Sequence, residues 1–178
     1  MKKLLISALV LTLSTSTFSQ INKGQWLAGG SVGFESSKYG NQDDTKTTTF
    51  QFSPNAGYFF LQNFAGGLRA TIQTEKVKGS DADNNLLFAP FVRYYFLPAL
   101  QKVNILADAS YGLGSVKSDG ESDGYNQFAF SAGPAIFLSQ HTALELLLQY
   151  RSAGGDAFGD DRLNNFGVNI GFQVHLGK

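Results

Sequence analysis

The chain between residues 164 and 176 reads NNFGVNIGFQVHL and has a strict period of two. Every even-numbered residue from Phe166 to Leu176 is apolar, whereas the odd-numbered residues between Asn165 and His175 are Asn, Gly, Gln or His. Successive side chains of a β-strand point to opposite faces, so this pattern predicts a strand with one apolar and one polar face.

Seven further segments alternate in the same way. They span residues 26–35, 47–60, 64–75, 86–97, 103–115, 126–138 and 142–151. No segment after residue 20 has helical periodicity or approaches the ~18 apolar residues of a membrane helix. The formal net charge of zero argues against a nucleic-acid partner, which would need a basic patch. The sequence therefore predicts an all-β domain of eight antiparallel strands.

The connections between these segments alternate in length. Those at 61–63, 98–102 and 139–141 are short, whereas those at 36–46, 76–85, 116–125 and 152–163 are long and hold nine of the ten Asp residues. An even number of strands, with short turns at one end and long loops at the other, is typical of an outer-membrane barrel. Closure removes both sheet edges, whose unpaired backbone groups lipid could not satisfy. We therefore expect an up-and-down transmembrane β-barrel.

A soluble ligand-binding barrel of the lipocalin type is the alternative, and Gly24-Gln25-Trp26 matches its G-x-W motif over three residues. The composition of the polar face favours the membrane barrel. No Lys lies in the predicted strands from residue 86 onward, where a water-facing barrel would carry many. The polar face instead consists mainly of Gly, Ser, Thr, Asn and Gln, which suit a narrow interior filled by side chains.

Residues 1–19 have the form of a secretory signal peptide. Lys2 and Lys3 precede a ten-residue apolar core from Leu4 to Leu13, and small and polar residues follow up to Ser19. We expect cleavage after Ser19, which leaves residues 20–178 as the barrel domain. The expected location is the outer membrane of a double-membrane bacterium.

The apolar face carries aromatic residues near both ends of the predicted strands. Such girdles mark the two interfaces of a membrane barrel. The predicted girdle at the short-turn end consists of Trp26, Tyr58, Phe60, Phe64, Tyr94 and Phe96. At the long-loop end it consists of Phe34, Phe50, Phe128, Tyr150 and Phe166.

Three stretches resemble the small outer-membrane β-barrel domain family, which has an OmpX/OmpA-like architecture. They are residues 24–34 (GQWLAGGSVGF), 53–60 (SPNAGYFF) and 89–96 (APFVRYYF). The resemblance covers nearly the whole chain after the signal peptide and implies the fold and the location. Many such barrels end on an aromatic residue that the assembly machinery reads, whereas here Leu176 is the last outward residue.

Six charged residues fall on the predicted inward face. Buried charges must pair, because an isolated one is very costly in free energy. We therefore interpret them as a structural network that plugs the lumen, with a gate or small-ion path as the alternative. They are Arg69, Glu75, Arg93, Asp108, Glu145 and Arg151.

Catalytic and metal-binding patterns are absent or incomplete. Asp119 to Gly124 resembles the start of a calcium loop, but the twelfth position is Phe130, where a bidentate Glu is needed. His141 and His175 both fall at the short-turn end, away from the long loops, and there is no cysteine. We therefore predict no enzyme, no cofactor and no metal site.

Pro54, Pro90 and Pro134 lie mid-strand on the outward face. Proline cannot donate to a ladder, so we expect a β-bulge at each of them.

The predicted function is structural or surface-interacting, in a barrel with a filled polar lumen. A narrow or gated channel for small solutes is the alternative, and a lipid-modifying enzyme is disfavoured by the positions of the histidines. The expected partners are outer-membrane lipid, the outer-membrane assembly machinery and an extracellular ligand at the loops 36–46, 76–85, 116–125 and 152–163. We expect a monomer.

Overall fold

The computed structural model describes residues 21–38, 46–77, 82–98, 101–118 and 121–177. The expected signal peptide lies outside these residues. The strands are β1 (Trp26–Lys38), β2 (Lys46–Leu61), β3 (Phe64–Val77), β4 (Ala82–Tyr95), β5 (Val103–Ser118), β6 (Glu121–Phe137), β7 (Thr142–Gly155) and β8 (Gly159–Leu176), with a short 3-10 helix, η1 (Asp156–Phe158), before β8. The described part holds no helix long and apolar enough to cross a membrane.

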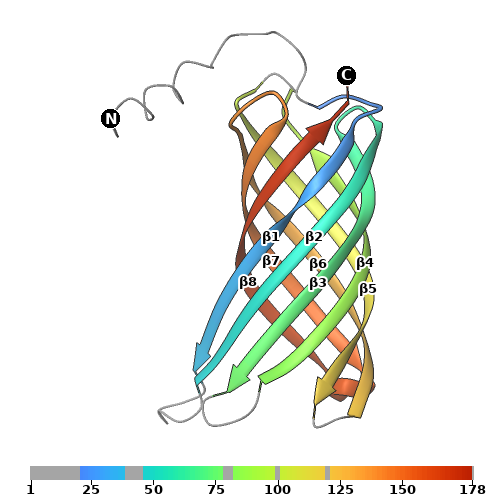
Figure 1. Cartoon of the computed structure of the whole chain (residues 1–178), viewed down its shortest axis with the longest axis vertical. Helices are drawn as coiled ribbons and strands as arrows, with labels where there is room; N and C mark the ends of the chain where they lie inside the picture. Colours follow the sequence, from blue (N-terminus) through green and yellow to red (C-terminus); the bar gives the residue numbers. More distant parts are fainter. Residues whose placement is uncertain (1–20, 39–45, 78–81, 99–100, 119–120, 178) are drawn as a thin grey trace, which may run out of the picture.

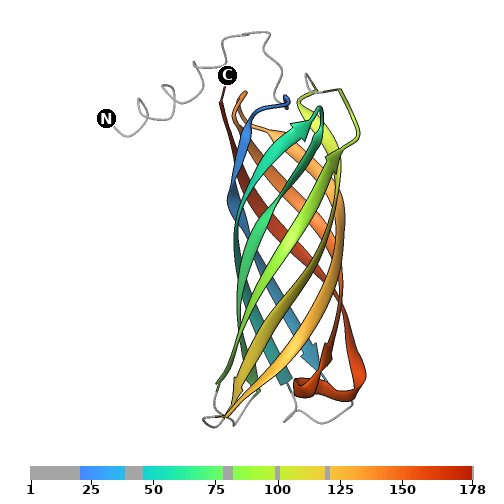
Figure 2. The same ribbon diagram turned by 90° about the vertical axis from the view of Figure 1, so that its right-hand side faces the viewer.

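Each strand pairs with its neighbour in sequence, and β1 closes the ring against β8 (Figure 1). All the ladders are antiparallel, including the β1–β8 seam from Trp26↔Leu176 to Gly33↔Asn169. The predicted eight-stranded up-and-down barrel is confirmed. We call its two ends the short-turn end, where β1 begins and β8 finishes, and the long-hairpin end, where η1 lies (Figure 2).

The short-turn end shows how local sequence fixes a tight reversal. Only Gln62 and Asn63 lie between β2 and β3, and Asn63 has φ of 63°. This left-handed conformation is uncommon outside glycine, and Asn is among the residues that tolerate it best. The Asn63 carbonyl also accepts a hydrogen bond from the Tyr95 amide at 2.9 Å, which ties the turn to β4.

The strands extend beyond the predicted limits at the long-hairpin end. The loop predicted at 116–125 is β-strand except at residues 119–120, which the structure does not describe, and β8 begins five residues before the predicted start at 164. A membrane-crossing strand needs only about 9–11 residues. The apolar alternation marks only the middle of each strand, whereas backbone pairing continues into the more polar residues beyond it. The predicted loop boundaries are therefore too wide.

The predicted bulges at Pro54, Pro90 and Pro134 are wrong. Beside Pro54, the β2–β3 pairing is interrupted between Phe52 and Asn55 and resumes in the same register. The β4–β5 pairing is interrupted in the same way beside Pro90, and the β6–β7 pairing beside Pro134. On its other side each proline stays paired. The missing N–H thus interrupts one ladder for two positions without an extra residue. The register shifts in the described ladders lie elsewhere, near the ends of β2 and β7.

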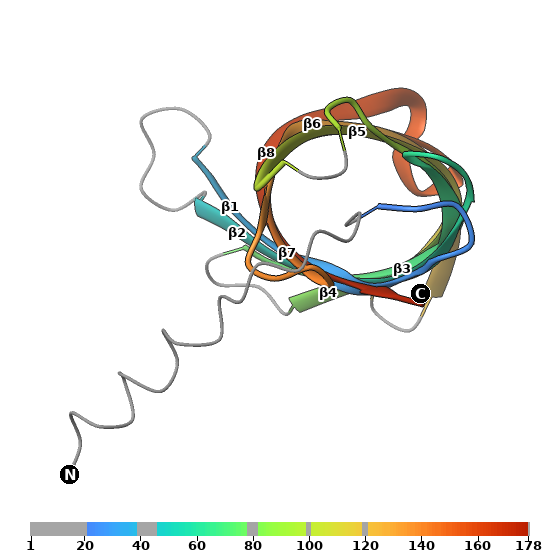
Figure 3. The ribbon, with the colours of Figure 1, turned by 90° about the horizontal axis from the view of Figure 1, so that it is seen from above.

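The interior has an apolar layer that the sequence interpretation did not include. Near the short-turn end, Leu27, Phe59, Tyr95 and Leu106 point inward and have no exposed surface. The segment that precedes β1 turns in over the opening (Figure 3), and the side chain of Ile21 is fully buried in this layer. The inward face is thus polar at mid-height and apolar at the short-turn end.

We expect Ile21→Ala to lower the free energy of unfolding by about 2–4 kcal/mol, because it removes a buried aliphatic side chain that little can replace. Urea unfolding of the refolded chain from residue 20 onward, in lipid vesicles, measures the effect. The matched control is Leu61→Ala at the same end, whose side chain is largely exposed on the outer surface. Equal losses for the two variants would contradict the buried position of Ile21.

Candidate functional site

Four of the predicted charged residues form one network across the lumen. The Arg93 guanidinium on β4 is the centre: its Nε donates to Asp108 Oδ2 at 3.1 Å, and its Nη1 donates to Glu145 Oε1 at 2.9 Å. Asp108 lies on the neighbouring strand, directly opposite Arg93, whereas Glu145 reaches it from β7. The chain of ion pairs therefore joins strands on different sides of the barrel.

Arg69 extends this network from β3. Its Nη1 and Nη2 donate to the two carboxylate oxygens of Asp108 at 3.0 and 2.9 Å. This bidentate geometry is the most favourable arrangement of an arginine–carboxylate ion pair. Both arginines also lie over the ring of Phe91, at 4.9 Å for Arg69 and 5.8 Å for Arg93. Two cations and two carboxylates therefore meet with no net charge between them.

Arg151 occupies a separate position nearer the long-hairpin end. Its Nη1 donates to Gln51 Oε1 and to Gln73 Oε1, each at 2.8 Å. Glu75, the sixth predicted member, lies in β3, and its side chain is outside the described residues.

Tyr95 belongs to the network and was not among the predicted site residues. Its hydroxyl lies 3.2 Å from Glu145 Oε1 and 3.5 Å from Arg93 Nη1. Period-two alternation places Tyr95 on the same face as Arg93, so the sequence contained the signal. A tyrosine in a row of apolar and aromatic residues does not by itself indicate a role inside a barrel.

Little space remains around the network. A cavity of about 20 Å³ lies between Arg69, Arg93 and Glu145, and another of about 10 Å³ lies beside Arg151. A water molecule needs roughly 10–15 Å³ on this measure. Each of these two cavities therefore has room for about one water.

The predicted short-turn aromatic residues form a belt on the outer surface. Trp26 and Tyr58 meet edge-to-face at a centroid distance of 5.2 Å. Continuous contacts at 4.9, 6.2 and 5.0 Å then link the four other rings of this belt. In order of contact, these rings belong to Phe60, Phe64, Tyr94 and Phe96. At the other end, Phe128, Tyr150 and Phe166 are in contact in the same way, at 6.2 and 4.9 Å.

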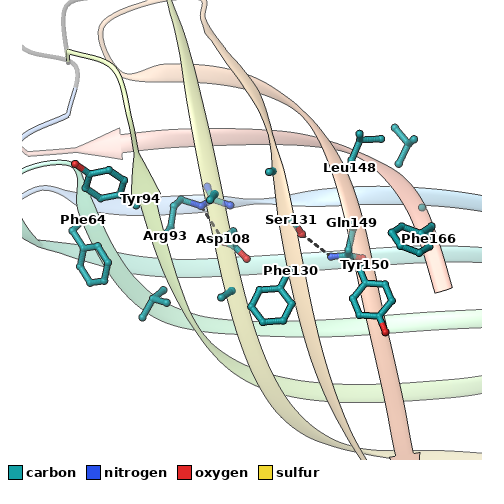
Figure 4. Close-up of a pocket in the computed structure, with 16 residues that line it drawn as sticks. Phe64, Arg93, Tyr94, Asp108, Phe130, Ser131, Leu148, Gln149, Tyr150 and Phe166 are labelled. Atoms are coloured by element: carbon teal, nitrogen blue, oxygen red, sulfur yellow. Dashed lines mark hydrogen bonds and ion pairs between the residues drawn. The ribbon is translucent and has the colours of Figure 1, made fainter. Parts of the chain in front are cut away.

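A hollow of about 660 Å³ lies on the outer wall, where Ala107, Ala109 and Ala132 leave room between larger apolar side chains. Figure 4 shows the aromatic rings that line this hollow, together with the Arg93–Asp108 ion pair on the inner face of the same wall. The rings labelled there belong to Phe64, Tyr94, Phe130, Tyr150 and Phe166. Alternation places these rings and the three alanines on the outward face, so the hollow belongs to the wall and not to the lumen.

The histidines lie where the sequence predicts, at the short-turn end. His141 is exposed in the β6–β7 turn, and His175 is fully buried among the rings of Phe59, Tyr95 and Phe137, at 5.6, 6.1 and 5.5 Å. Within the described ranges, neither ring nitrogen of His175 has a hydrogen-bond partner, and no group of residues could hold a metal ion.

Comparison with known proteins gives matches of two kinds. Residues 5–173 match the model of a family described as "Outer membrane protein beta-barrel domain". Among solved structures, Neisserial surface protein A (NspA) aligns at 12% identity with a TM-score of 0.58, covering 85% of this chain and 97% of that one. The outer membrane protein OprG from Pseudomonas aeruginosa aligns at 16% identity with a TM-score of 0.55, covering 90% and 100%. No curated protein matches.

Proposed function

The chain belongs to the outer membrane protein beta-barrel domain family, and we propose that it serves as a filled, non-conducting barrel that presents its hairpins at the surface of the outer membrane. The role is structural or surface-interacting. The barrel supplies a rigid anchor, and the extended β-hairpins with their Asp-rich tips supply the contacts. The structural likeness to the two solved barrels supports a shared fold alone. The proposed function therefore rests on the side chains inside this barrel.

The observation that carries the proposal is the network centred on Arg93. Its two carboxylate partners come from β5 and β7, and the cavities beside it have volumes of about 20 and 10 Å³. An ion or solute that crossed at this height would have to separate buried ion pairs, which is strongly unfavourable. The apolar layer around Ile21 adds a second barrier at the short-turn end.

The proposal also covers export, membrane assembly and the extracellular contact. Residues 1–19 act as a signal peptide, and the assembly machinery inserts the barrel as a monomer in contact with outer-membrane lipid. The proposed role is not catalytic, and His141 and His175 both lie at the short-turn end, away from the long hairpins. The hairpins between β1 and β2, β3 and β4, β5 and β6, and β7 and β8 carry the contact with an extracellular ligand.

A narrow or gated channel is the second candidate, and one observation favours it. Both amide atoms of Gln173 and both ring nitrogens of His175 are buried without a hydrogen-bond partner among the described residues. Buried polar atoms of this kind often bind ordered water. A chain of such waters beside the Arg93 network would be the start of a path for small ions.

Planar-bilayer recording separates the two candidates. We expect the purified protein to give no steady single-channel steps, because the side chains that close the lumen come from several strands and are held by ion pairs. The matched variant Arg93→Ala should raise the frequency of conducting events if it still inserts. Reproducible steps from the unaltered protein would overturn the filled-barrel proposal.

The surface role needs a test in cells. Cells that lack the protein should become more sensitive to detergent or lose adhesion, and the unaltered chain should restore the phenotype. A chain with Asp43, Asp44, Asp81 and Asp119 changed to Asn alters only positions between the described strands, so it tests the acidic connections. Full restoration by this variant would assign the role to the barrel and not to the acidic tips.

A further inference from the structure

A cavity lined by polar and apolar residues, among them Arg151, lies inside the barrel near the long-hairpin end, between the Arg93 network and the hairpins. It has a volume of about 230 Å³. Four carboxamide side chains from different strands line it: Gln73, Asn85, Gln127 and Asn165. Each carboxamide offers both donors and an acceptor, so the wall suits a ligand whose groups do the same.

Two of these carboxamides differ in their hydrogen-bond partners. Gln73 Oε1 accepts a hydrogen bond from Arg151 at 2.8 Å. Asn85 Oδ1 is buried and has no hydrogen-bond partner among the described residues. A buried acceptor without a partner is unfavourable, and a donating ligand would satisfy it.

Aromatic side chains form another part of the cavity. Tyr125 on β6 and Phe158 in η1 both line it, and their rings meet edge-to-face with centroids 5.8 Å apart. Phe158 belongs to the short helix that connects β7 to β8, at the end of the barrel shown in Figure 2. The wall therefore combines ring surfaces with carboxamides.

The hairpin that carries Phe158 is held in place. Gly155 has φ of 125°, and a Cβ at this position would lie 3.1 Å from the Tyr125 Cα, so β7 packs tightly against β6. Arg162 donates to the Ser152 hydroxyl and carbonyl oxygens, both at 2.9 Å, and to Asn126 Oδ1 at 3.0 Å. These contacts fix the cavity wall before any ligand arrives, which lowers the entropy cost of binding.

We propose that this cavity binds a single neutral sugar ring. Hydroxyl groups donate and accept, as the surrounding carboxamides do, and the C–H face of a pyranose packs against an aromatic ring. The inference extends the proposed function by giving the surface contact a chemical class. It does not depend on a closed lumen, since the cavity lies on the hairpin side of the Arg93 network.

The test is a titration of the isotope-labelled full barrel in bicelles, followed by NMR. Methyl glycosides of galactose, glucose and mannose are the probes, and we expect at least one to give saturable shifts at Tyr125 and Phe158 with a millimolar dissociation constant. Phe158→Ala should weaken binding roughly two- to tenfold through the lost ring contact. Asn165→Leu should weaken binding as well, whereas its neighbour Asn164→Leu, outside the cavity, should not.

Two further probes complete the design. Lactose carries a terminal galactose ring attached to a second sugar. A dissociation constant equal to that of methyl galactoside would indicate that the cavity binds the ends of glycans. Loss of lactose binding would indicate that it binds free monosaccharides. Benzoate tests a carboxylate in place of a sugar. Saturable shifts with benzoate and none with the glycosides would overturn the proposal, as would glycoside shifts that Phe158→Ala and Asn165→Leu leave unchanged.

Discussion

Arg93→Met is expected to lower the free energy of unfolding by about 3–5 kcal/mol, because it leaves the Glu145 carboxylate buried without its cation. Glu145 is 1% exposed and keeps its contact with the Tyr95 hydroxyl, whereas Asp108 keeps both contacts with Arg69. Methionine fills much of the volume of the arginine stem, so the loss reports charge and not a cavity. Urea unfolding in lipid vesicles gives the measurement.

The double variant Arg93→Met/Glu145→Gln provides the control. It removes the stranded charge together with its partner, so most of the lost stability should return, and Glu145→Gln alone should cost less than Arg93→Met. A loss below about 1 kcal/mol for Arg93→Met would mean that the network does not hold the strands together, since that is the ordinary size of a surface substitution or exposed ion pair.

The same residues show how far sequence reasoning reaches. Period-two alternation assigns Arg69, Arg93, Asp108 and Glu145 to the inward face, and the requirement that buried charges pair predicts that they meet. Which cation takes which carboxylate depends on the strand register. Arg93 lies directly opposite Asp108 in the β4–β5 ladder, but its contact with Glu145 crosses the lumen. No local pattern encodes that second contact.

The interior apolar layer shows a different limit. Phe59 and Tyr95 fall on the inward face by alternation, yet both of their strand segments end in aromatic residues on both faces. At such ends the pattern no longer separates lipid from lumen. Ile21 precedes the first strand and has no periodicity at all, so its burial follows only from the path of the chain over the rim.

Gly67→Ala is expected to lower the free energy of unfolding by about 3 kcal/mol or more, since a Cβ at this position would overlap the backbone of β2. It would lie against the Ala56 carbonyl oxygen and only 2.6 Å from the Gly57 Cα. Gly57 and Gly67 are directly paired. Neither contact is with a flexible side chain, so one of the two strands would have to move.

A second inward glycine makes the experiment decisive. Gly167 on β8 has open space around its Cβ position, with no atom within 4 Å, and its φ is not in the left-handed region. Gly167→Ala should therefore be neutral or raise stability by about 0.4–1 kcal/mol through the unfolded state. Refolding yield and the heat-induced shift in gel mobility measure both variants. Equal refolding yields and gel shifts for Gly67→Ala and Gly167→Ala would contradict this explanation. They would show that the close approach of β2 and β3 at Gly67 does not require a glycine.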